Sequence, residues 1–108
     1  MIYQNANDIF ETLSKSKQRT EVGNVMRLAI EYARMRVDHL VAPPDKQQAI
    51  SEERSKTHNA LIKACDVLAA AMEAAHEDVL WRETLGQDRK DIGDFACYVH
   101  CRLGIEAR

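Results

Sequence analysis

A short stretch near the end of the chain, FACYVHC at residues 95–101, places two thiols and an imidazole within about one turn of a helix. Cys97, His100 and Cys101 are residue types that bind zinc, as thiolates and a neutral imidazole. A fourth ligand would have to come from another segment. The candidates for that role are His58, Cys65 and His76. These six residues define a candidate metal site, and a metal-binding helical bundle is one hypothesis for the function.

The same stretch also fits a packed helix. Zinc sites usually pair their cysteines two residues apart in turns, whereas Cys97 and Cys101 are separated by three residues. A buried free cysteine behaves as a small hydrophobic residue and lets a neighbouring helix approach closely. A disulfide between two cysteines one helical turn apart would be strained. We therefore favour packing roles for Cys97 and Cys101, and we predict no bound metal and no cofactor.

A second pattern with chemical content is RMRVDH at residues 34–39. The Arg34-x4-His39 spacing resembles that of the HEPN family, helical ribonucleases often found as bacterial toxins. The resemblance covers six residues and implies RNA cleavage by Arg34 and His39. Met35 departs from the polar residue that usually follows the arginine in that family.

Arg34 also belongs to a row of opposite charges. Arg27 and Glu31, Glu31 and Arg34, and Arg34 and Asp38 are spaced three or four residues apart, which is typical of a solvated helix face. We favour this interpretation over catalysis and expect the protein not to be an enzyme, with a ribonuclease-like toxin component kept as an alternative.

The totals place the chain among ordinary globular domains. It has 108 residues, 45% of them hydrophobic and 30% charged, which suits a single domain over residues 1–108. The net charge of −2 argues against a general nucleic-acid binder, although Lys15, Lys17, Arg19 and Arg27 gather positive charge early in the chain. No run of 18 apolar residues predicts a membrane span. The start has no signal-peptide pattern, and three cysteines fit reduced thiols, so we expect a cytoplasmic location.

Apolar residues recur at helical spacing in four segments, and no segment alternates as a strand would. The predicted fold is an all-α, up-and-down four-helix bundle with a long third helix. The predicted helices span residues 7–17, 21–41, 48–84 and 88–105. The polar composition of the early third helix leaves open whether residues 43–56 are ordered.

Particular positions support these boundaries. The second helix carries a stripe that continues as far as Val37 and Leu40, so we expect both side chains to be buried. Gly86 predicts a helix C-terminus, and Asp88 predicts the N-cap of the last helix. Trp81 is expected to close one end of the core.

The predicted third helix would be about 55 Å long at 1.5 Å per residue, against about 30 Å for the second and fourth. Part of it would extend beyond its neighbours. A homodimer in which the long helices overlap would cover this part. The sequence therefore predicts a small helical protein that acts by association with itself or with a protein partner.

Overall fold

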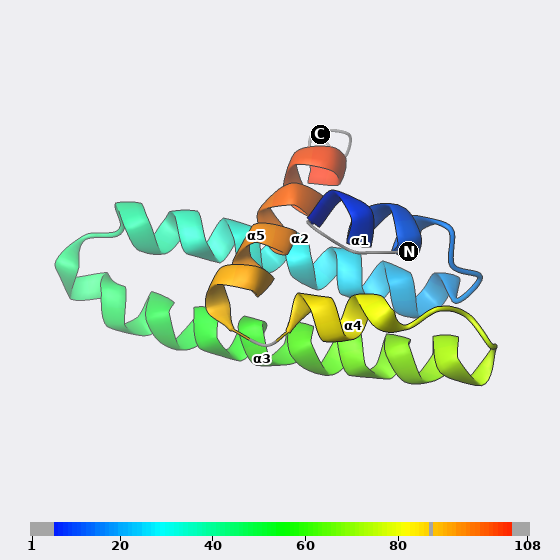
Figure 1. Ribbon diagram of the computed structural model, residues 1–108. Helices are drawn as coiled ribbons and strands as arrows, with labels where there is room; N and C mark the ends of the chain where they lie inside the picture. Colours follow the sequence, from blue (N-terminus) through cyan, green and yellow to red (C-terminus); the bar gives the residue numbers. More distant parts are fainter. Residues whose placement is uncertain (1–5, 87, 105–108) are drawn as a thin grey trace.

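The frame of the molecule is a helical hairpin made of α2 (Arg19–Val41) and α3 (Pro44–Ala74). The computed structural model describes residues 6–86 and 88–104, with side chains to residue 103. At 1.5 Å per residue the 31 residues of α3 span about 46 Å, close to the longest dimension of the molecule, 48 Å. A second layer on one face of this hairpin is formed by α1 (Ala6–Ser14), α4 (Leu80–Leu85) and α5 (Arg89–Val99), as Figure 1 shows.

The all-α prediction is confirmed, and the described residues contain five α-helices and a π-helical turn, η1 (His100–Gly104). Two features of the arrangement were not predicted. The helix expected over residues 48–84 is divided into α3 and α4, and α5 lies steeply across α2 in Figure 1 rather than alongside it. The stretch 43–56, whose order the sequence left open, forms the Pro43 N-cap and the first three turns of α3.

Both ends of α3 have local causes. Pro43 is extended, at φ −60° and ψ 151°, and Pro44 takes the first helical position, where its missing N–H removes no hydrogen bond. At the other end His76 has φ 61°; its N–H donates to the Glu73 carbonyl, and the Glu77 N–H donates to the Met72 carbonyl. This is a Schellman motif with histidine in the position that glycine usually occupies. It reverses the chain and ends the long helix ten residues before the predicted end.

The beginning of α5 follows the predicted capping chemistry. The Asp88 carboxylate accepts the Asp91 N–H at 2.8 Å, and Gly86 has a positive φ of 67° where α4 ends. These two signals end α4 at Leu85 and start α5 at Arg89, four residues later.

The core lies between the hairpin and the second layer. Trp81 is fully buried, as expected for a residue that closes the core, and α1 is held to α5 by an edge-to-face contact between Phe10 and Tyr98 at 5.5 Å. The largest fully buried side chains are Trp81, Tyr32, Phe95, Leu13, Leu61, Leu68, Met72 and Ile92. They come from all five helices, and they belong to one hydrophobic cluster.

The predicted burial of the last turns of α2 is wrong. Val37 is 57% exposed and Leu40 is 80% exposed, because the second layer ends before it reaches this part of the hairpin. We call residues 37–53 the hairpin tip. Among the described helices none is both long and apolar enough to cross a membrane.

Candidate functional site

The chemistry-bearing residues of FACYVHC lie along one groove between α2 and the end of α5. The groove has a volume of about 430 Å³. From α2 it is lined by Ala33, Arg34, Val37 and Asp38; from α5 and η1 it is lined by Cys97, His100 and Cys101. Two thiols, an imidazole, a guanidinium and a carboxylate therefore face one hollow at the boundary between the covered part of the hairpin and its tip.

Packing roles for Cys97 and Cys101 are not what the structure shows, since both thiols are exposed. The buried face of α5 is formed by Ile92, Phe95 and Val99 with two small residues between them. The neighbour that approaches Cys97 is the guanidinium of Arg36, whose Nη1 lies 3.5 Å from Sγ. A polar contact at the surface thus takes the place of the helix-to-helix contact that the small residues suggested.

The end of α5 changes its winding where the groove begins. His100 starts the π-helical turn that includes Cys101. Such turns are rare and occur frequently at functional sites. The wider turn changes the direction of His100 and Cys101 relative to an ideal α-helix, so their positions on the helix face could not be obtained from a 3.6-residue period.

The other three metal candidates lie elsewhere. Cys65 is fully buried in the core, and this burial raises the pKa of its thiol to about 12. It is therefore a protonated packing residue at neutral pH. His58 is buried against Tyr32, with ring centroids 5.4 Å apart, and His76 is the exposed residue that ends α3.

Within residues 6–86 and 88–103, no three side chains of the histidine, cysteine or carboxylate types are grouped closely enough to hold a metal ion. Cys97, His100 and Cys101 share a groove, but the structure does not bring His58, Cys65 or His76 to complete a ligand set with them.

The two residues of the HEPN-like spacing also point to different neighbours. Arg34 lines the groove beside α5, whereas His39 contacts Arg54 of α3, with Nδ1 3.5 Å from the guanidinium. A five-residue separation on a helix rotates two side chains by about 140°, which accounts for this divergence. The residues of this resemblance do not converge on one site.

The predicted row of opposite charges on α2 is only partly formed. Arg27 and Glu31 make an exposed ion pair at 3.3 Å. Arg34 and Asp38, both described and one turn apart, make no ion pair with each other or with another described residue. Both charges instead face the groove.

The feature that sequence reasoning missed is an apolar ridge at the hairpin tip. Val37, Leu40 and Val41 are exposed by 57%, 80% and 75%. We call these three residues the tip ridge. The signal was present, because the apolar stripe of α2 continues into the tip, but the stripe does not reveal whether anything in the same chain covers it.

Comparisons of the chain with protein-family models, with curated proteins and with solved structures find no match.

Proposed function

We propose that this protein acts by association with a second copy of itself, through the tip ridge and the adjoining groove. The observation that carries the proposal is the exposure of three large aliphatic side chains, Val37, Leu40 and Val41, at the end of α2. An exposed apolar patch next to polar residues is typical of protein interfaces. The groove extends this surface with a hollow into which a side chain of a partner could fit.

The charges around Val37 favour a second copy over an unrelated partner. In an antiparallel pairing of two α2 helices centred on Val37, Arg34 of one copy and Asp38 of the other lie on the same side of the contact. They are then about 3 Å apart along the helix axis, at 1.5 Å per residue. Neither residue has an ion-pair partner within its own chain among the described residues. A twofold contact would pair both charges twice, as a self-complementary interface requires.

Native mass spectrometry, on protein purified without chelators or metal-affinity resin, tests association and metal binding together. The expected mass is twice 12.3 kDa with no additional metal. A monomer at every concentration would contradict the proposal. An integer number of metal ions per chain would favour the alternative of a metal-binding bundle built on Cys97, His100 and Cys101.

A charge exchange tests the geometry of the contact. Arg34→Glu should weaken the dimer by placing two acidic groups opposite each other, and the double variant Arg34→Glu with Asp38→Arg should restore it. Arg27→Glu, on the same helix but away from the tip ridge, is the matched control and should leave the dimer intact. Failure of the double variant to restore association would rule out the antiparallel pairing.

We also propose a non-enzymatic, cytoplasmic protein. Three free thiols, two of them exposed, suit a reducing compartment. The thiols, the imidazole and the carboxylate of the groove would be covered in part by the dimer.

A further inference from the structure

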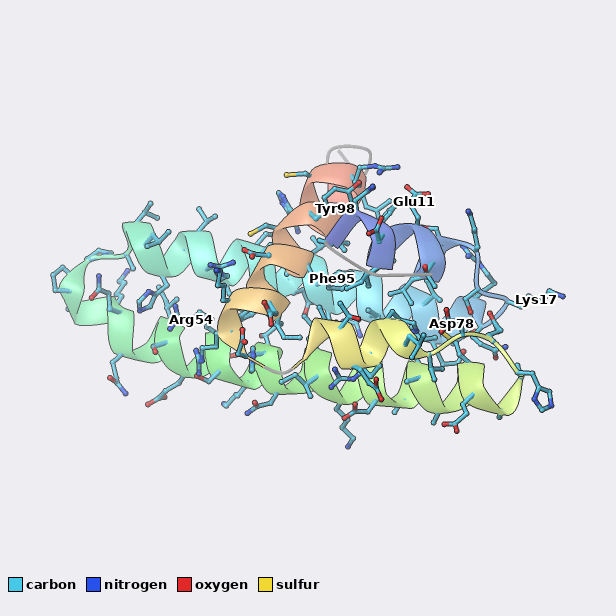
Figure 2. The ribbon with its side chains drawn as sticks, viewed as in Figure 1. Glu11, Lys17, Arg54, Asp78, Phe95 and Tyr98 are labelled. Atoms are coloured by element: carbon cyan, nitrogen blue, oxygen red, sulfur yellow. The ribbon has the colours of Figure 1, made fainter. Side chains whose placement is uncertain are left out.

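Three arginines from three different helices lie around the start of α5. Arg36 belongs to α2, Arg54 to α3, and Arg89 to the first turn of α5. The Arg89 Nη2 donates to the Ser55 hydroxyl at 3.0 Å, which places Arg89 beside the residue that follows Arg54. Figure 2 shows Arg54 on the tip side of the start of α5.

The position of Arg36 is fixed by a close approach to α5. Its guanidinium lies over Gly93, and a Cβ at that position would overlap the guanidinium. Gly93 is one turn beyond Arg89 on the same face of α5. Arg36 and Arg89 are therefore neighbours on one side of this helix.

The register of the hairpin brings Arg54 to the same level. Tyr32 and His58 are in contact across α2 and α3. Because the two helices are antiparallel, one turn further toward the tip places Arg36 opposite Arg54. The contact between Arg54 and His39, less than one turn beyond Arg36, is consistent with this register.

None of the three guanidinium groups makes an ion pair with a described carboxylate. Their hydrogen-bond partners are the Cys97 sulfur, the His39 ring and the Ser55 hydroxyl. Three acids next to Arg54 and Arg89 or close to them in the sequence have other partners. Glu53 pairs with Lys56, Glu52 accepts from Gln48, and the Asp88 carboxylate caps α5.

The Nε of Arg54 is buried and has no hydrogen-bond partner among the described residues. Buried polar groups are almost always hydrogen-bonded, so this donor is open to an acceptor from outside the chain. Three like charges held together also repel one another unless an opposite charge joins them.

We propose that Arg36, Arg54 and Arg89 form a binding site for a small phosphate-bearing anion. Guanidinium groups present parallel N–H donors that match the oxygens of phosphate in a bidentate manner. An oxyanion bound here would supply the acceptor that Arg54 Nε lacks and the negative charge that the three guanidinium groups lack. Arg54 of α3 and Arg89 of α5 take no part in the tip ridge, so the inference does not depend on the dimer.

The test is calorimetric titration of the purified protein with inorganic phosphate, in chloride buffer of constant ionic strength. Saturable binding is expected. Arg54→Gln and Arg89→Gln should each weaken it by about tenfold or more, since each removes a charge-assisted hydrogen bond. Arg27→Gln removes the same charge from an exposed arginine that is paired with Glu31, and it should leave binding unchanged within about twofold.

The result that would overturn the proposal is the absence of saturable phosphate binding to the wild-type protein, or an equal loss in Arg27→Gln. Circular dichroism of each variant confirms that the fold is retained. Arg89→Lys adds a second criterion, because it keeps the charge and loses the planar donors. Weaker binding in Arg89→Lys than in the wild-type protein is expected, and full retention would contradict recognition by a guanidinium.

Discussion

The two halves of the α2–α3 hairpin are both helical but have different surroundings. In the half near the second layer, Leu61, Leu68 and Met72 are buried in the core cluster. In the tip, Val37 and Leu40 continue the stripe of α2 and are exposed. The difference arises from the lengths of the covering helices, since α5 has 11 residues and α4 has six, against 31 in α3. An apolar stripe therefore shows which face of a helix requires a partner, and the partner can belong to another chain.

The largest expected effect comes from matched leucine truncations in the two halves. Leu68→Ala should lower the free energy of unfolding by about 2–5 kcal/mol, because it leaves a cavity in a closely packed core. Leu40→Ala should change it by less than about 0.5 kcal/mol in the monomer. Urea unfolding followed by the fluorescence of the buried Trp81 measures both. Similar losses in the two variants would mean that the tip is covered within the chain.

The end of α3 offers a stabilising change. His76 has a left-handed backbone, which is unfavourable for residues with a Cβ, and glycine is the usual residue there. His76→Gly should raise the free energy of unfolding by about 1 kcal/mol. His76→Ala is the control, because it removes the ring without relieving the backbone. A stabilisation by alanine as large as that by glycine would show that the ring, and not the backbone, is unfavourable.

The start of α5 decides how well the second layer covers the hairpin. Asp88→Ala removes the side-chain cap that accepts the Asp91 N–H, and should lower stability by about 1 kcal/mol. Asp88→Asn keeps a capping oxygen without the charge and should recover most of the loss. Thermal unfolding compares the three proteins. An alanine variant as stable as the wild-type protein would show that this cap contributes little to the position of α5.

The smallest effect is a pH dependence at the end opposite the tip. The Gln18 side chain donates to Glu77 at 2.9 Å and lowers the pKa of that carboxyl, with further hydrogen bonds from Ser16 and the Lys17 N–H. A lowered pKa in the folded state means that the contribution to stability is complete above the unfolded value of 4.5 and is lost as the pH falls through the folded value.

Glu77→Gln should therefore be less stable than the wild-type protein at pH 7, with a difference that disappears in acid. Urea midpoints measured for both proteins at pH 7 and near pH 3 provide the comparison. A difference that persists unchanged in acid would show that the charge of Glu77 has no part in joining the two loops at this end.

Local signals in the sequence predicted much of the fold. The first predicted helix is present with Ile9, Phe10 and Leu13 buried, and Asp88 and Gly86 act where capping chemistry placed them. The end of α3 carried no such signal. His76 occupies a glycine position, and nothing in the residues 48–84 interrupts the helical period.

The candidate site was less predictable for a physical reason. The sequence identified Cys97, His100 and Cys101, but their exposure depends on α5 crossing α2 and on the π-helical turn at His100. Arg36, Arg54 and Arg89 are separated by up to 53 positions, and only the tertiary arrangement joins them. Helical periodicity describes one element at a time, whereas both sites are made by two or three.

Sedimentation equilibrium of the wild-type protein and of two valine variants tests the central claim most directly. Val37 and Val67 are similarly exposed, at 57% and 53%, but only Val37 belongs to the tip ridge. We expect the wild-type protein and Val67→Lys to sediment as dimers and Val37→Lys to sediment as a monomer of 12.3 kDa. A wild-type monomer at all concentrations, or equal behaviour of the two variants, would contradict association through the hairpin tip.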